Sequence, residues 1–138
     1  LPRTTSRSYM ISVKVIGGKA AANKLKNYGL VIKGASARAI SKIALRVSND
    51  AKQFAPVDLG ELRASIGIDF DPSIPQAIVG PTVNYAAPVE FGSRPHFPPV
   101  EPLAERGTSP HPFLRPAAMQ AKQYAPGIVS ADIKQAIK

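Results

Sequence analysis

The segment APVDLGELRASI, residues 55–66, brings together the kinds of side chain that acid–base and nucleophilic catalysis use. Its ionisable and hydroxyl groups belong to Asp58, Glu61, Arg63 and Ser65. A serine becomes a nucleophile when a histidine held by an acid removes its proton, and this segment has neither a histidine nor a G-x-S-x-G turn. The spacing of Asp58 and Glu61 is that of a capping box, so we interpret the two acids as caps of a short turn.

The two histidines are the next candidates for catalysis or metal binding. His96 and His111 lie in one proline-rich stretch, with Glu90, Glu101 and Glu105 nearby in the sequence. Neither histidine belongs to an H-x-x-x-H or H-E-x-x-H pattern, which would place two metal ligands on one face of a helix. A hydrolase that uses a histidine with Glu101 therefore has only residue types in its favour.

Two further features argue against a catalytic site. Asp69 and Asp71 would share one face of an expected strand, but nothing nearby predicts the burial that separates the pKa values of a catalytic pair. The chain has no cysteine, which removes thiolate nucleophiles, disulfides and sulfur-ligated zinc. We therefore expect a protein that is not an enzyme and has no cofactor and no metal.

Length and charge narrow the class of protein. The 138 residues fit a single domain over 1–138, and a hydrophobic content of 44% indicates a folded chain. No apolar run reaches the roughly 20 residues of a membrane span, so we expect no membrane contact. Residues 1–60 carry 11 Lys and Arg against two acids, whereas residues 61–138 are balanced. This asymmetry indicates either an anionic partner or a solvated basic helix face.

The first part of the chain is predicted to be a strand followed by helix. Residues 1–8 are expected to form a flexible N-terminal arm, and Ile11, Val13 and Val15 then alternate with polar residues as in a half-buried strand. From residue 19 the pattern is helical, with a bend or break expected where Gly29 and Gly34 weaken the helix.

A clearer helix follows and should end before Pro56, which disfavours helical geometry in the residue before it. Its apolar stripe consists of Ile40, Ile43, Ala44, Val47, Ala51 and Phe54. Arg38, Lys42 and Arg46 repeat every fourth residue on the opposite face, and we expect them to face solvent or an acidic partner.

The second part of the chain predicts a hairpin, an irregular segment and a helix. Residues 66–71 and 76–83 have the patterns of two strands joined by a proline-rich loop. Residues 93–112 form a proline-rich loop or arm, and a helix starts near Phe113 with Pro116 in its first turn. Pro126 and Gly127 should break or kink that helix.

These elements together predict an α+β fold. A small antiparallel sheet packs against a long N-terminal helix and a C-terminal helix, and the proline-rich irregular arm lies outside this unit.

Three blocks of sequence resemble one protein family when they are taken together. AKQFAPVDLGELRASI resembles A-P-V-D-T-G-x-L-x-x-S-I, YAAPVEFGS resembles Y-A-x-Y-V-E-F-G-T, and PFLRPAAMQA resembles P-F-L-R-P-A. In this order they are similar to the tail-completion, or minor tail-component, proteins of long-tailed bacteriophages. This chain departs from the pattern at Leu59, Pro88 and Ser93, where Thr, an aromatic residue and Thr are usual.

The resemblance implies a structural role without catalysis. Proteins of this family form a ring, commonly of six copies, at the head-proximal end of the tail. The resemblance implies contacts with the tail tube and with terminator or head connector proteins, while genomic double-stranded DNA passes through the ring without sequence-specific binding. It places the chain in the neck of the virion, after assembly in the host cytoplasm.

The family blocks also imply roles for particular residues. The residues expected to shape the fold are Pro56, Asp58, Gly60, Glu61, Tyr85, Glu90, Phe91, Gly92, Phe113, Arg115 and Pro116. We expect the group at 85–92 to hold a strand and its turn, and Arg115 to have a carboxylate partner such as Glu90.

Six residues are candidates for contacts with other subunits. They are Arg38, Lys42, Arg46, Arg94, Phe97 and Val100, the last two as apolar anchors of the proline-rich arm. The alternative interpretation is a small basic nucleic-acid-binding protein, which the sequence pI of about 10.1 favours. The chain lacks the interleaved aromatic residues that would stack on bases.

Overall fold

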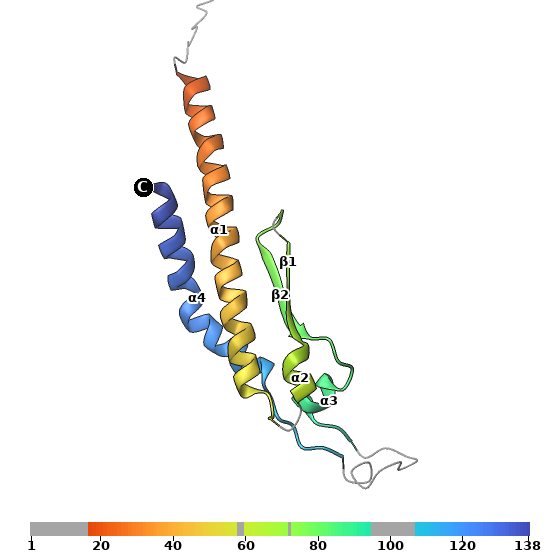
Figure 1. The fold of residues 1–138 in the computed structure, drawn as a ribbon. Helices are drawn as coiled ribbons and strands as arrows, with labels where there is room; N and C mark the ends of the chain where they lie inside the picture. Colours follow the sequence, from red (N-terminus) through yellow and green to blue (C-terminus); the bar gives the residue numbers. More distant parts are fainter. Residues whose placement is uncertain (1–16, 58–59, 72, 95–106) are drawn as a thin grey trace, which may run out of the picture.

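A computed structural model of the chain describes residues 17–57, 60–71, 73–94 and 107–138 (Figure 1). The elements in chain order are α1 (Gly18–Phe54), α2 (Gly60–Ser65), β1 (Ile66–Asp71), β2 (Gln76–Pro81), α3 (Ala86–Phe91) and α4 (Leu114–Ile137). The α+β class is confirmed, with α1 lying between α4 on one side and the β1–β2 hairpin on the other. Within the described residues, no helix combines the length and the hydropathy that a membrane span needs.

Helix α1 is continuous over 37 residues, so the bend or break predicted at Gly29 and Gly34 is wrong. A glycine costs a helix only about 1 kcal/mol relative to alanine, which a ladder of hydrogen bonds on both sides can absorb. The predicted end is confirmed, because Ala55, which precedes Pro56, has extended dihedral angles. The Ala55 N–H still donates to the carbonyl oxygen of Ala51 at 2.9 Å, which closes the last turn.

The strands β1 and β2 pair in antiparallel fashion, as predicted. Their register sets Ile66 opposite Pro81 and Asp69 opposite Ile78. Both strands of this sheet, as described, are edge strands. Pro81 is tolerated there because a proline, which has no N–H to donate, can occupy an edge strand.

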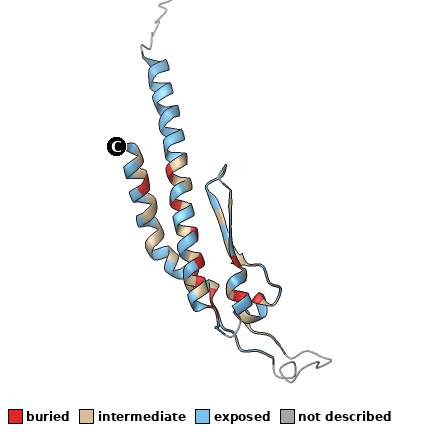
Figure 2. Cartoon of the chain, viewed as in Figure 1, coloured by how far each residue is buried: buried red, intermediate tan, exposed pale blue. Residues whose placement is uncertain are grey.

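The fully buried side chains come from three separate parts of the chain. Phe113, Leu62 and Ile66 are the largest of them. Four small residues complete this cluster: Ala51, Ala55, Ala86 and Ala117. Alanines allow the helix backbones to approach closely, and Figure 2 shows that the buried part of α1 is the part beside the hairpin and α4.

The apolar stripe predicted for residues 40–54 is only partly buried. Ala44 and Ala51 are buried, but Phe54 is 39% exposed and Leu45, which lies off the stripe, is exposed as well. The predicted stripe assumed that only one side of the helix would be covered by other elements. Because α1 is covered on two sides, its buried residues are spread over two faces and are small.

Helix α4 begins at Leu114, next to the predicted start at Phe113, and contains Pro116 in its first turn. It is not broken at Pro126, which lies inside the continuous helix. Figure 1 shows α4 changing direction partway along, which is the kink expected where a proline removes one hydrogen bond.

The prediction of a strand and turn at residues 85–92 is wrong. Residues Ala86–Phe91 form the short helix α3, and Gly92 follows it with a φ of 77°. A helical turn points Glu90 inward and Phe91 outward, so Glu90 is buried and Phe91 is exposed.

Several predicted features lie outside the described residues. They are the arm at 1–8, the strand with Ile11, Val13 and Val15, the cap residue Asp58, and most of the proline-rich arm, with His96, Phe97, Val100, Glu101 and Glu105. Of that arm, residues 93–94 and 107–112 are described, and Ser93 and Thr108 pair there as an isolated antiparallel bridge.

Candidate functional site

The corner at residues 55–66 uses its polar side chains for structure. The Arg63 guanidinium donates to the carbonyl oxygen of Ala55 at 3.2 Å, and the Ser65 hydroxyl donates to the carbonyl oxygen of Leu62 at 2.8 Å. The Tyr85 hydroxyl donates to the Glu61 carboxylate at 3.4 Å. These bonds tie α2 to the end of α1 and to the start of α3. In the described part of this corner, residues 55–57 and 60–66, these hydrogen bonds hold the turn together.

Glu90 forms the most highly coordinated polar group in the described structure. One of its carboxylate oxygens accepts from the backbone N–H of Phe113 at 2.7 Å and of Leu114 at 3.0 Å. The other oxygen accepts from the backbone N–H of Arg115 at 2.9 Å. Phe113 is the N-cap residue of α4 and makes no side-chain cap bond. Glu90 therefore acts as the cap of α4 from a distant part of the sequence.

The charge of Glu90 is favoured by its surroundings. Burial by itself raises the pKa of this carboxyl, but the three backbone N–H donors and then the charge of Arg115 outweigh burial and lower the pKa below its ordinary value. The positive end of the α4 dipole lies at the same place. The predicted pairing of the Arg115 side chain with Glu90 is not among the ion pairs of the described residues; the backbone N–H of Arg115, not its guanidinium, donates to Glu90.

Gly92 allows the chain to turn out of α3 at this point. Its φ of 77° is unfavourable for residues with a side chain, and an added Cβ would lie 2.8 Å from the carbonyl oxygen of Thr108. After the turn, Ser93 and Thr108 exchange backbone hydrogen bonds at 3.0 and 3.3 Å. The two ends of the proline-rich segment are therefore joined to each other beside α3.

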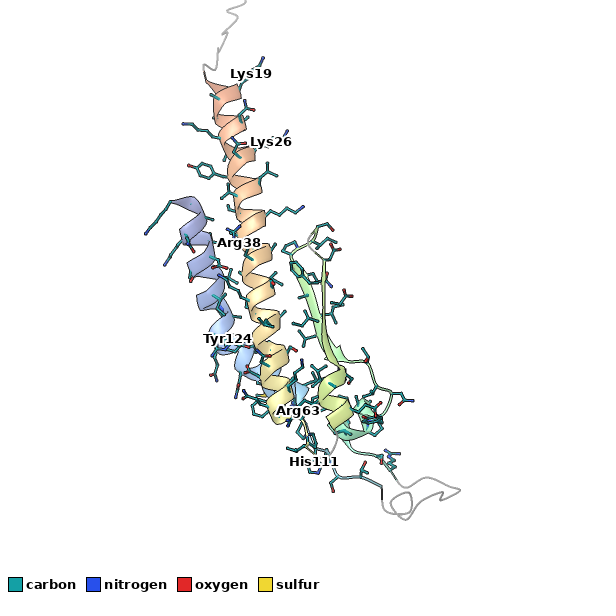
Figure 3. All side chains as sticks on the ribbon, viewed as in Figure 1. Lys19, Lys26, Arg38, Arg63, His111 and Tyr124 are labelled. Carbon is teal, nitrogen blue, oxygen red and sulfur yellow. The ribbon has the colours of Figure 1, made fainter. Side chains whose placement is uncertain are left out.

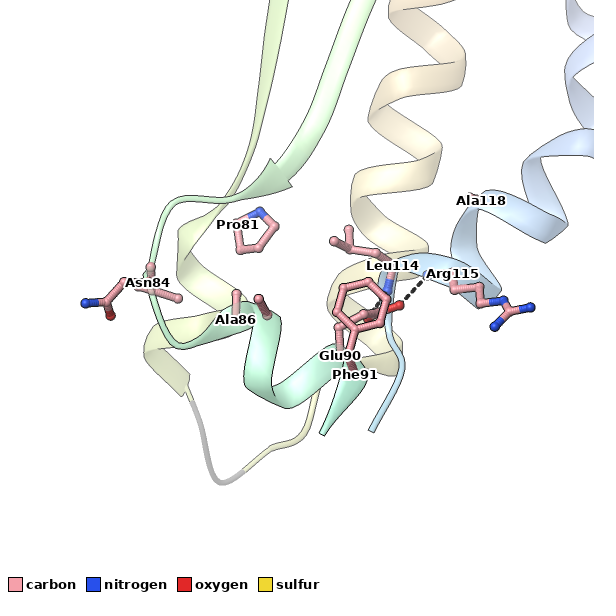
Figure 4. Close-up of a pocket in the computed structure, with 10 residues that line it drawn as sticks. Pro81, Asn84, Ala86, Glu90, Phe91, Leu114, Arg115 and Ala118 are labelled. Carbon is pink, nitrogen blue, oxygen red and sulfur yellow. Dashed lines mark hydrogen bonds between the residues drawn. The ribbon is translucent and has the colours of Figure 1, made fainter. Parts of the chain in front are cut away.

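A groove opens between α3 and the first turns of α4 (Figure 4). It has a volume of about 690 Å³ and is mainly apolar. We call it the base groove, and it is lined by Pro81, Val83, Asn84, Ala86, Ala87, Glu90, Phe91, Leu114, Arg115 and Ala118. Phe91 is 78% exposed, although an aromatic ring in water costs free energy that burial would recover. Arg115 and Asn84 give the groove polar ends.

The basic residues of α1 are less available than the sequence indicated. Lys42 makes an ion pair with Asp132 of α4 at 2.7 Å, and Arg46 lies over the ring of Tyr124 at 4.0 Å from its centroid. The Tyr124 hydroxyl donates to Asp50 at 3.2 Å. In the single chain, Lys42 and Arg46 hold α4 against α1.

The residues Asp50, Tyr124 and Asp132 were missed by sequence reasoning, although their spacing contains a signal. Lys42 and Asp50 are eight residues apart on α1, and Tyr124 and Asp132 are eight apart on α4. Because α1 and α4 run antiparallel, the equal spacing allows Lys42 to meet Asp132 while Asp50 meets Tyr124. The equal spacing predicts these contacts only once it is known that α1 and α4 pack against each other.

The remaining described candidates make no ion pair with one another. Arg38 and Arg94 are exposed, and His111 is exposed with its backbone N–H donated to the carbonyl oxygen of Val89 at 2.7 Å. Asp69 and Asp71 are both exposed on the hairpin. Within the described residues, no three His, Cys, Asp or Glu side chains gather as metal ligands would.

Comparison with known proteins gives one match. The family model described as "Bacteriophage HK97-gp10, putative tail-component" matches residues 19–92, which is more than half of the chain. The match runs from the first turn of α1 to the glycine after α3. No curated protein and no solved structure matches the chain.

Proposed function

The chain belongs to the HK97-gp10-like family of bacteriophage tail components, and we propose that it is a structural protein of the phage neck. In this proposal, copies of the chain form a closed ring, with six copies as the expected number, at the head-proximal end of the tail. The ring completes the tail and joins it to the head connector. The family match over residues 19–92 is the observation that carries this proposal.

The surface of the single chain supports a role in assembly. Large hydrophobic side chains are exposed at both ends of the elongated structure, among them Leu25 near the start of α1 and Phe91 in the base groove. A soluble monomer seldom exposes such groups together without a partner. In a ring, each copy meets its two neighbours through two different surfaces, so surfaces at separate places on one chain suit this symmetry.

The partners in this proposal are further copies of the chain, the tail tube protein, and terminator or head connector proteins. Double-stranded DNA passes through the ring without being read. The chain would make no bond and break none, and it would be found in the virion. Arg38 and Arg94, both exposed, and the proline-rich arm with Phe97 and Val100 are the proposed contacts to these partners.

A substitution at Phe91 tests the proposal in assembled particles. Because the ring is 78% exposed in the single chain, Phe91→Ser should change the free energy of unfolding by no more than about 0.5 kcal/mol. In a phage that lacks its own copy of the gene, this variant should yield detached heads and tails. Met119→Ser is the matched control, since Met119 is 59% exposed and does not line the base groove.

Three results would refute the proposal. The first is a phage without this protein that still carries firmly joined, infectious tails. The second is an electron cryo-microscopy map of the neck in which no ring of this chain lies between tail and connector. Purified protein that turns over a substrate would refute the structural role.

A nucleic-acid-binding role remains the second candidate because of one observation. Lys19, Lys24, Lys26 and Lys33 lie on the exposed half of α1, where there is no acid. Duplex DNA held by the purified chain at about 50 mM salt and released at about 200 mM would favour this role.

A further inference from the structure

The first part of α1, residues 18–33, has no covering element in the described structure. Every residue of it is exposed, and most of it extends past the end of α4 and the tip of the hairpin (Figure 1). We call residues 18–33 the free half of α1. It carries four lysines, no acid, and five large exposed hydrophobic residues: Leu25, Tyr28, Leu30, Val31 and Ile32.

The free half has little that would keep it helical by itself. Gly17 at its N-cap makes no side-chain hydrogen bond, and Lys19 puts a positive charge in the first turn, where the dipole favours a negative one. Gly29 costs about 1 kcal/mol relative to alanine. The free half continues from the packed part of α1 but has no packing of its own, and in proteins most helical stability comes from packing of an apolar face. The free half therefore needs a covering surface, and its charge indicates an acidic one.

One face of the free half leads directly to the hairpin of the same chain. Lys19, Lys26 and Lys33 are seven residues apart and so lie on one face, and Leu30 lies on this face between the last two lysines. Figure 3 shows Lys19 and Lys26 on the part of α1 beyond the hairpin. The charge of Lys33 contributes to lowering the pKa of Asp71, after the larger effect of the Ser73 hydrogen bonds. Asp71 at the hairpin turn is therefore near enough for the charge of Lys33 to favour its ionised form, although the described residues contain no ion pair between the two.

The outer face of the hairpin has the complementary pattern. The register places Asp69 opposite Ile78, and beside them Gly67 opposite Gly80, on the face away from the buried Ile66. The two glycines leave a hollow of about 300 Å³, with Ile78 and Asp69 in its wall. Ile78 is 60% exposed, Asp69 is exposed as well, and the Asp69 carboxylate makes no ion pair with any described residue. Residues 66–81 contain two acids and no Lys or Arg.

We propose that the outer face of the hairpin covers the free half of α1 in a second copy of the chain. Leu30 of one copy enters the hollow against Ile78 of the next, and Lys26 pairs with Asp69 there. The lysine stem suits this position because its methylene groups can lie on apolar surface while the ammonium reaches the carboxylate. The inference rests on the proposed ring, since it supplies the contact between neighbouring copies.

The contact cannot form within one chain. Lys26 lies about 10 Å further along α1 than Lys33, at 1.5 Å per residue, whereas Asp69 lies two residues further from the hairpin turn than Asp71. In one chain, Lys26 lies on the part of α1 beyond the tip of the hairpin (Figure 3), whereas Asp69 lies within β1, opposite Ile78 and below that tip. A contact between two different surfaces of two copies is the kind that closes a ring.

Charge reversal tests this contact in the purified chain. Lys19→Glu/Lys26→Glu makes the face of the free half acidic, and Asp69→Lys makes the hairpin basic. Each change should weaken self-association about tenfold or more in about 50 mM salt, measured by sedimentation velocity, and much less in about 500 mM salt. The chain with all three changes should regain association to within about threefold of the wild type, because the charges are again complementary.

The design separates lost contact from lost folding. Lys19→Glu places an acid in the first turn of α1, which stabilises the helix, so weaker association would not come from its unfolding. Circular dichroism of each variant checks this directly. The matched control is Lys122→Glu/Lys134→Glu, which reverses two exposed lysines on α4 and should leave self-association nearly unchanged.

Four results would overturn the inference. A triple variant as weak as the two losses combined would show that the surfaces do not meet. The purified wild-type chain could retain duplex DNA, lose this retention with the lysine changes and fail to regain it in the triple variant. That result would assign the face to nucleic acid. Association that none of the changes affects would refute this contact and leave the ring standing. A wild-type chain that stays monomeric to about 1 mM would refute the ring in solution and this contact together.

Discussion

Replacing Glu90 tests whether one carboxylate joins α3 to the start of α4. Glu90→Ala removes the acceptor of three backbone N–H groups, at Phe113, Leu114 and Arg115. The N–H groups of Leu114 and Arg115 can turn to water, because these residues are partly or fully exposed, but that of the buried Phe113 cannot. One hydrogen bond to a charged group contributes about 1.5–3 kcal/mol, and loss of a helix cap costs about 1 kcal/mol. We therefore expect Glu90→Ala to lower the free energy of unfolding by about 3 kcal/mol.

Glu90→Gln isolates the contribution of the charge. It keeps the shape and one acceptor oxygen, so its expected cost at pH 7 is about 1–2 kcal/mol. The pKa of Glu90 is lowered in the folded chain, which means that the unfolded chain takes up the proton first as the pH falls. The stabilisation is complete above the ordinary pKa of 4.5 and is lost as the pH falls through the lowered folded value. The difference between wild type and Glu90→Gln should shrink over the same range.

Urea unfolding followed by circular dichroism, at pH 7 and at steps down to about pH 3, measures both effects. Glu61→Gln is the control, because Glu61 is an exposed carboxylate whose hydrogen bond to Tyr85 is long, at 3.4 Å. It should cost no more than about 0.5 kcal/mol. Equal losses for Glu61→Gln and Glu90→Gln at pH 7, or a Glu90→Gln loss that does not change with pH, would refute the capping role.

Two other perturbations test the backbone and the helix pair. Gly92→Ala should lower the free energy of unfolding by about 2 kcal/mol or more, because of the positive φ and the close Thr108 oxygen, whereas Gly127→Ala in open space within α4 should raise it by up to about 1 kcal/mol. A double-mutant cycle on Lys42 and Asp132 should give a coupling of about 1 kcal/mol that falls with salt, since the lysine is 58% exposed and the carboxylate is buried. Equal effects of the two alanines, or a coupling near zero at low salt, would contradict these interpretations.

Much of the local structure could be predicted from short stretches of sequence. The end of α1 at Pro56, the two strands of the hairpin and the start of α4 near Phe113 follow from backbone chemistry or from period-two alternation, which neighbours in the chain determine. The three sequence blocks indicated the family that the match over residues 19–92 shows.

The candidate surfaces could not be predicted in the same way. The family block at residues 85–92 led us to expect a strand and turn, and it did not reveal that Glu90 would cap a helix more than 20 residues later. The repeat of Arg38, Lys42 and Arg46 indicated an open basic face, but α4 covers part of it. Phe91 is exposed because residues 86–91 form the helix α3, whereas a strand was expected there from the sequence.

The sequence by itself determined the end of α1, the two strands of the hairpin, the start of α4, the basic first half of the chain and its family. Those properties depend on residues within a few positions of one another, or on the order of residues alone. Only the tertiary structure decided which charges are paired, that Glu90 caps α4, and that the free half of α1 and the base groove are left uncovered. These facts depend on which faces of distant segments meet, and a helix or strand has the same local sequence pattern whichever neighbour covers it.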